Sequence, residues 1–175
     1  RYTGTRNNRS WESAYSLLLA DPEYNKLVIR EVKRLADQDA RILVLTNRIA
    51  HGILLPDMLA GEDIEARFLS GSDKTAWRAV KLNQLQKGAI QVIVATEIFE
   101  EGVDAPEINA LVMASAGRSY RQVLQRVGRA LRKKKQGPNE ATVVDFCPLV
   151  NYYLAQHAMS RVAVYKAEGF EFMWV

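Results

Sequence analysis

Residues 41–52 read RILVLTNRIAHG, in which a short apolar run with branched side chains leads into a polar turn and then into an apolar helical pattern. Similar apolar runs recur at residues 64–70, 91–96, 110–115 and 141–146. Most of these runs lack a strict alternation of apolar and polar residues, which indicates strands buried on both faces. Helical patterns fall between and after the runs, at residues 49–59, 74–86, 119–131 and 149–168. The alternation predicts an α/β fold of three layers, in which helices flank a parallel sheet.

The segment before residue 41 has a helical pattern of its own. Asp21 and Pro22 form a cap and first-turn pair ahead of an amphipathic stretch. Residues 1–9 are polar and lack apolar periodicity, which is typical of a linker or a frayed end. We therefore expect residues 1–40 to be an N-terminal helical and linker segment, and residues 41–175 to form one domain.

The composition is that of an ordinary globular domain, with 175 residues of which 48% are hydrophobic and 25% are charged. No apolar run approaches the roughly 20 residues of a membrane span, and no signal peptide opens the sequence. The expectation is a soluble, intracellular, cytoplasmic protein that has no membrane contact. Cys147 and the two histidines have no partners at ligand spacing, so no metal site is predicted.

A local excess of positive charge lies between residues 118 and 135, where eight basic residues and no acidic one occur. The octet QRVGRALR within it places four polar side chains on one side of a helix: Gln125, Arg126, Arg129 and Arg132. A guanidinium group can bind phosphate with two hydrogen bonds and keeps its charge near neutral pH. The same pattern also fits a solvated basic helix with surface ion pairs, and both interpretations stay open at this point.

The first four apolar runs each end in a hydroxyl residue that is followed by a polar or glycine-bearing turn: Thr46, Ser70, Thr96 and Ser115. In open parallel sheets, ligands bind beyond the carboxyl ends of the strands. The turns after the strands are therefore predicted to share one edge that carries the candidate site.

The turn after the third run reads ATEIFEEGVDAP over residues 95–106. Gly102 permits a tight backbone turn there, and Asp104 supplies a carboxylate just beyond it. Such a carboxylate suits the hydroxyls of a ribose. It equally suits an ordinary acidic surface turn, and the residues alone leave both roles open.

Three segments taken together carry a resemblance. The ordered set TNRIAHG, ATEIFEEGVDAP and QRVGRALR is similar to motifs IV, V and VI of superfamily 2 helicases, and its order and spacing agree over residues 41–146. The resemblance implies the second, C-terminal RecA-like lobe, with a P-loop-NTPase-like fold, of an ATP-dependent nucleic-acid helicase or translocase.

The resemblance also implies an ATP site, with Mg²⁺, that is shared with an N-terminal RecA-like lobe. Arg129 and Arg132 resemble the arginine fingers that reach the γ-phosphate of ATP. Residues that would organise the seam between the lobes, or approach the nucleotide and its ribose, are Gln125, Arg126, Gly102 and Asp104. Residues implied to contact the nucleic-acid backbone come from three turns: Thr46, Asn47, Arg48, Ser70, Gly71, Thr96 and Glu97.

Three departures from the DEAD-box pattern indicate the subgroup of helicases that the chain resembles. DEAD-box proteins usually carry histidine where Gln125 stands, a second Gly-Arg where Leu131 and Arg132 stand, and arginine where Glu101 stands. The chain therefore resembles the DNA translocase branch more closely, which includes repair, restriction-type and phage helicases. DNA is favoured over RNA as the partner on this basis.

Neither a GxxxxGK[ST] phosphate loop nor a DExx motif occurs in the sequence, although phosphoryl transfer in such motors requires both. We therefore expect ATP and Mg²⁺ to be held mainly by a first lobe that precedes this chain, and the chain alone to be inactive. Two alternatives remain: a non-hydrolysing nucleic-acid-binding module with a RecA-like fold, or the translocase lobe of a restriction enzyme. The oligomeric state is left open.

Overall fold

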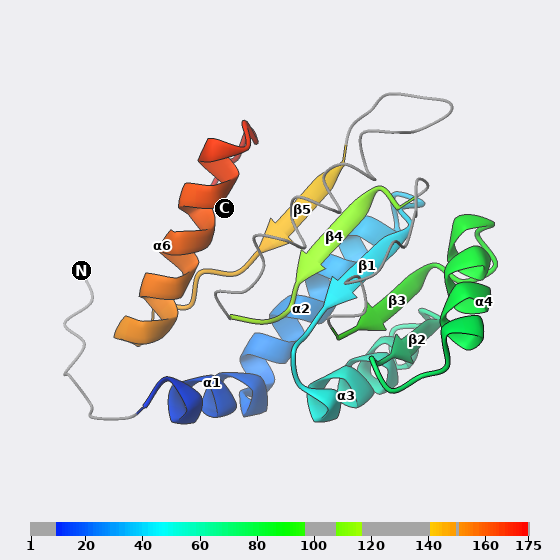
Figure 1. The fold of residues 1–175 in the computed structure, drawn as a ribbon, viewed down its shortest axis with the longest axis horizontal. Helices are drawn as coiled ribbons and strands as arrows, with labels where there is room; N and C mark the ends of the chain where they lie inside the picture. The colour runs from blue at the N-terminus through cyan, green and yellow to red at the C-terminus, as the bar shows by residue number, and fades with distance from the viewer. Residues whose placement is uncertain (1–9, 97–107, 117–140, 150, 175) are drawn as a thin grey trace.

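The computed structural model describes residues 10–96, 108–116, 141–149 and 151–174. These residues contain a five-stranded sheet in the order β2-β3-β1-β4-β5, and every pairing in it is parallel. In Figure 1 the five arrows accordingly point the same way. The strands are β1 (Ile42–Leu45), β2 (Ala66–Leu69), β3 (Val92–Ala95), β4 (Ala110–Met113) and β5 (Thr142–Asp145). The structure thus confirms the predicted α/β class and places a strand within each of the five apolar runs.

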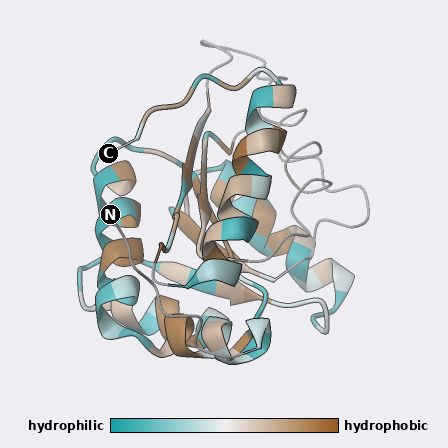
Figure 2. Cartoon of the chain, turned by 90° about the vertical axis from the view of Figure 1, so that its left-hand side faces the viewer, coloured by the Kyte–Doolittle hydropathy of each residue, from teal (hydrophilic) through white to brown (hydrophobic). Residues whose placement is uncertain are grey.

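Helices cover both faces of the sheet. They are α1 (Trp11–Ala20), α2 (Pro22–Ala36), α3 (Ile49–Ala60), α4 (Thr75–Gln86) and α6 (Tyr152–Ala167). Helices α1, α2 and α3 share one hydrophobic core with the sheet, and α4 shares the other with part of α6. Figure 2 shows the strands between these layers carrying the hydrophobic colour. The predicted three-layer architecture is therefore confirmed.

Alternation along the strands explains why two cores form. In β1, Ile42 and Val44 belong to the core under α2 and α3, whereas Leu43 and Leu45 belong to the core under α4. Successive side chains of a strand point to opposite faces, so a strand buried on both faces must be apolar throughout. All four of these side chains are at most 1% exposed. The central strands follow this rule, while the edge strands β2 and β5 are partly exposed.

The N-terminal segment contains two helices that pack on this body. Asp21 caps α2 by accepting a hydrogen bond from the backbone of Glu23 at 2.9 Å, and Pro22 occupies the first position, as predicted. The sequence did not single out α1, which begins after Ser10 and buries Tyr15. Both helices join the core of the sheet, and the domain division at residue 40 stays a prediction.

Helix α3 approaches β2 at a glycine. A Cβ atom built on Gly52 would collide with the ring of Phe68, so only glycine fits at this crossing without repacking. The close approach holds the start of α3 against β2. The turn between β1 and α3, where the candidate site begins, is thereby held in place as well.

Candidate functional site

The carboxyl ends of β1, β2 and β3 lie side by side at one edge of the sheet. The strand register aligns Leu45 with Ala95, and Leu69 with Ala95 from the other side. The backbone N–H of Thr46 donates to Ala95 at 2.9 Å, and that of Thr96 donates to Leu69 at 3.1 Å. These hydrogen bonds continue the ladder by one residue, so the hydroxyl residues that end the strands are held at a common edge as the sequence predicted.

Thr46 is fully buried, and its side chain is fastened to α3. Its hydroxyl lies 3.0 Å from Nδ1 of His51, whose Nε2 lies 2.8 Å from the amide oxygen of Asn25. The Asn25 amide nitrogen donates to the carbonyl of Leu19 at 2.9 Å, so its oxygen must accept from Nε2–H of His51. Nδ1 is then the acceptor, and Thr46 donates to it. This polar chain ties α2, α3 and the end of β1 together.

Burial of His51 keeps its ring neutral in this chain. The side chain is 3% exposed, and desolvation lowers its pKa from the ordinary value of 6.5 to about 4. A protonated ring would lose its acceptor at Nδ1, so the neutral form is also the one that the hydrogen bonds require. Sequence reasoning took His51 as a structural or surface residue, and the structure gives it the structural role.

Asn47 and Arg48 follow Thr46 and are exposed at the surface, where α1 lies against them. The hydroxyl of Tyr15 donates to the amide oxygen of Asn47. The guanidinium of Arg48 pairs with the carboxylate of Glu12 and stands 5.6 Å from the centre of the Tyr15 ring. Two residues predicted to bind nucleic acid therefore meet side chains of a helix that the sequence did not single out.

The turn after β2 is closed by an aspartate. The backbone N–H and the hydroxyl of Ser70 donate to Asp73 at 2.6 and 3.1 Å, and the Ser70 and Ser72 hydroxyls lie 2.7 Å apart. Gly71 is exposed, and a Cβ atom there would meet nothing within 4 Å. Thr96, on the neighbouring strand, is half-buried. The turn thus exposes backbone at Gly71 while the Ser70 side chain shapes the loop.

The other predicted site residues lie outside the described residues. They are Glu97, Gly102, Asp104, Gln125, Arg126, Arg129 and Arg132. Their proposed contacts with ATP or nucleic acid stay predictions.

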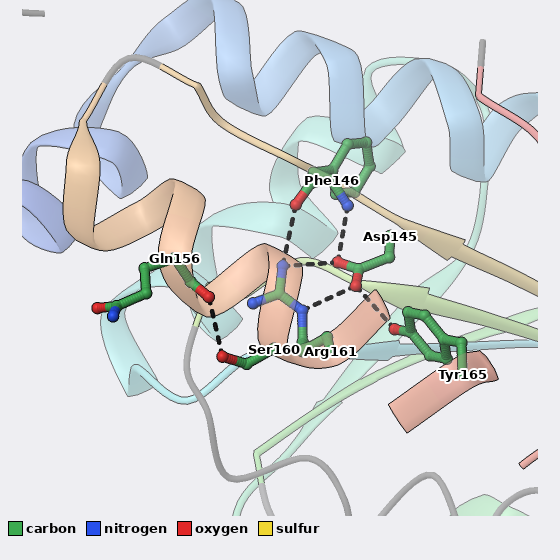
Figure 3. A network of polar contacts seen from close by, with 6 residues as sticks. All are labelled: Asp145, Phe146, Gln156, Ser160, Arg161 and Tyr165. Atoms are coloured by element: carbon green, nitrogen blue, oxygen red, sulfur yellow. Dashed lines mark hydrogen bonds and ion pairs between the residues drawn. The ribbon is translucent and has the colours of Figure 1, made fainter. Parts of the chain in front are cut away.

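Sequence reasoning missed a buried polar cluster at the carboxyl end of β5 (Figure 3). Arg161 of α6 is 2% exposed and donates to both carboxylate oxygens of Asp145, at 2.7 and 3.0 Å. It also donates to the carbonyl of Phe146 at 3.0 Å, while the Tyr165 hydroxyl donates to Asp145 at 2.7 Å. Burial, followed by the nearby carboxylate, raises the pKa of Tyr165. The cluster fastens α6 to the sheet.

Within the described ranges, no group of three or more His, Cys, Asp or Glu side chains could hold a metal ion. No helix in these ranges is long and apolar enough to cross a membrane.

A five-stranded parallel sheet covered on both faces, with hydroxyl residues at the carboxyl ends of its strands, defines an open α/β domain of three layers. The family of the helicase conserved C-terminal domain matches residues 23–134, and the chain belongs to this family.

Relatives in sequence agree with this membership. The chain is 31% identical over 122 residues to a protein named putative helicase 22 of Sulfolobus islandicus filamentous virus, covering 67% of the chain and 22% of the relative. It is 31% identical over 112 residues to the UvrABC system protein B of Pseudomonas aeruginosa, covering 60% and 16%. It is 23% identical over 188 residues to the ATP-dependent DNA helicase uvsW of Enterobacteria phage T4, covering 98% and 37%. The chain thus spans only 16–37% of the length of these relatives.

Solved structures agree on the fold. The crystal structure of T4 UvsW matches 95% of the chain and 37% of its own chain, with a TM-score of 0.78 and 24% identity. The C-terminal domain of the DEAD-box protein Dbp5 matches 85% of the chain and 80% of its own chain, with a TM-score of 0.63 and 16% identity. The expected RecA-like lobe is therefore confirmed as a fold.

Proposed function

We propose that the chain is the second motor lobe of an ATP-dependent helicase or translocase that acts on nucleic acid, with DNA as the favoured strand. The observation that best supports the proposal is that Thr46, Ser70 and Thr96, which follow β1, β2 and β3, lie at one carboxyl edge of a helicase-family domain. In the resemblance, motif IV begins at Thr46 and motif V includes Thr96, while Ser70 begins a further turn that contacts the strand. An edge with exposed backbone and an exposed arginine suits a phosphate chain.

The proposal that the chain contacts ATP rests on two arginines and an aspartate whose chemistry suits a nucleotide. Arg129 and Arg132 would stabilise charge on the γ-phosphate of ATP bound by a first lobe, and Asp104 would meet the ribose hydroxyls. Guanidinium groups and a carboxylate fit a nucleotide. Because the sequence has neither a phosphate loop nor a DExx motif, the Mg²⁺ ion would be held mainly by the first lobe together with the phosphates. Arg126, Gln125 and Gly102 would complete the contact between the two lobes around the nucleotide.

The turn residues divide into two kinds under this proposal. Asn47, Arg48, Gly71 and Thr96 are the groups placed to meet the strand, because each is at least partly exposed. Thr46 and Ser70 act indirectly, because both are buried and their hydroxyls are engaged in shaping the turns. Glu97 is kept as a proposed contact of the motif V turn.

DNA is favoured over RNA for two reasons. The chain departs from the DEAD-box pattern at Glu101, Gln125 and Leu131. One of its relatives in sequence is named an ATP-dependent DNA helicase. A direct comparison of binding to the two kinds of strand tests this preference.

The test is binding of fluorescein-labelled single-stranded DNA and RNA of one sequence, followed by fluorescence anisotropy. We expect tighter binding of DNA, an affinity that falls with salt, and a loss of about fivefold in Arg48→Gln. Arg34→Gln is the matched control, because Arg34 is a similarly exposed arginine of α2 that pairs with Glu31 instead. Absence of binding to either strand, or equal losses in the two variants, would overturn the proposed interface.

A further inference from the structure

Helix α1 holds an acidic side chain against an arginine of the candidate interface. The carboxylate of Glu12 pairs with the guanidinium of Arg48, which also stands over the ring of Tyr15. Helix α1 lies near the end of the sheet towards which the strands point in Figure 1. A carboxylate offers a guanidinium two oxygens in a plane, which is the arrangement that a backbone phosphate also offers. Glu12 and a nucleic-acid phosphate are therefore chemically equivalent partners for Arg48.

The ion pair between Arg48 and Glu12 is exposed, so Arg48 can exchange the carboxylate for another anion. The Arg48 and Glu12 side chains are 44% and 62% exposed, and ion pairs this exposed are weak. The pair between Arg161 and Asp145 contrasts with it, because its side chains are only 2% and 15% exposed. A phosphate that approaches Arg48 from solvent therefore competes with a partner that is held loosely.

The body of α1 does not need to move for this exchange. Tyr15 is 1% exposed and Leu18 is 7% exposed, so both anchor the helix in the core. The Trp11 ring stacks on Tyr15 at 5.0 Å with an angle of 8° between the rings, and it lies 4.1 Å from the ring of His157 in α6. Rotation of the exposed Glu12 side chain is sufficient to release Arg48.

The second contact of α1 orients Asn47 instead of blocking it. Its amide oxygen accepts from the Tyr15 hydroxyl, which leaves the amide nitrogen as the group that can donate to an acceptor. A phosphate oxygen is such an acceptor. Tyr15 therefore presents Asn47 in the orientation that binding a strand requires.

We propose that Glu12 is a built-in competitor of nucleic-acid phosphate for Arg48, so that strand binding at this turn displaces the Glu12 carboxylate. The inference rests on the proposed function, because it takes Arg48 as a ligand of the strand. Its consequence is that the resting domain binds nucleic acid more weakly than its own basic residues allow. Any partner or condition that draws Glu12 away would then tighten binding without a change of fold.

The experiment measures the Kd of the 175-residue chain for a fluorescein-labelled oligothymidine by anisotropy at low salt. We expect Glu12→Gln to bind about two- to fivefold more tightly than the wild type, the size expected for one exposed ion pair. Glu23→Gln is the matched control, because Glu23 is likewise an exposed first-turn glutamate, at the start of α2, with Lys26 as its partner. It removes the same charge from the same position of a helix.

The double variant Glu12→Gln, Arg48→Gln separates competition from a general gain of positive charge. We expect its affinity to equal that of Arg48→Gln alone. Equal affinities of Glu12→Gln and Glu23→Gln, or a gain that survives without Arg48, would overturn the competition while leaving the proposed function standing. If neither the wild type nor Glu12→Gln binds the strand, the proposed function fails and the competition fails with it.

Discussion

The hydroxyl of Thr46 donates to Nδ1 of His51 at 3.0 Å, so the residue that ends β1 is fastened to the first turns of α3. The backbone N–H of Arg48 in turn points to the Thr46 hydroxyl at 3.4 Å. A buried threonine thus sets the course of the turn that exposes Asn47 and Arg48. The candidate interface is therefore built on a buried, hydrogen-bonded chain of polar side chains.

Replacing Thr46 with valine keeps the shape of the side chain and removes the hydroxyl. Nδ1 of His51 then lacks its donor inside the core, which we expect to lower the free energy of unfolding by about 1–3 kcal/mol. Urea unfolding followed by circular dichroism measures the change. Thr46→Ser keeps the hydroxyl and serves as the control. A valine variant as stable as the serine variant would mean that the hydrogen bond does not support the turn.

Lowering the pH should reduce the stability of the folded protein, because His51 becomes protonated. The pKa is about 4 in the folded protein, and the ordinary value is 6.5, so the unfolded state takes up the proton first as pH falls. Stability from this group is complete above about pH 6.5, is lost between 6.5 and 4, and changes no further below 4. The loss is on the order of 3 kcal/mol.

Urea unfolding near pH 7 and near pH 4 checks this expectation, with His51→Gln as the comparison because glutamine does not titrate. The wild type should lose more stability than the variant over this interval. NMR titration of the ring gives a second measurement. A ring that titrates near its ordinary pKa in the folded protein would contradict the buried neutral histidine.

The Asp145 carboxylate should be essential for holding α6 against the sheet. Asp145→Asn leaves Arg161 charged and buried without its anion, and we expect a loss of about 3–5 kcal/mol. Glu65→Gln is the control, because Glu65 pairs with Arg67 at the surface and should cost less than about 1 kcal/mol. Thermal unfolding of the two variants measures the difference. Similar melting temperatures would show that the cluster contributes little to stability.

The sequence predicted the five strands well because each is a compact apolar run, and burial on both faces demands such a run. The shared carboxyl edge was also predictable, because parallel strands place their ends together. Helix α1 was missed as a separate element, although Trp11, Tyr15 and Leu18 recur at helical spacing. Its ten residues form a weak pattern, and its packing against Asn47 arises from contacts far apart in sequence.

Two features of the site could not be predicted for the same reason. Thr46 was expected to hold a phosphate, and the burial of its hydroxyl depends on Asn25, which lies on another helix. The partnership of Arg161 with Asp145 joins a helix to a strand end 16 residues earlier. A lone arginine within a helical pattern carries no sign of its partner, since side-chain networks are set by tertiary packing.

Under the proposed function, this lobe supplies arginines to ATP held by a first lobe. The kcat of nucleic-acid-stimulated ATP hydrolysis by the complete protein tests it most directly, with the Kd for the strand measured on the same variants. Arg129→Ala should lower kcat by about a thousandfold and leave strand affinity nearly unchanged, whereas the control Arg34→Ala should change neither. Loss of strand binding in Arg129→Ala while ATP turnover survives would contradict the claim.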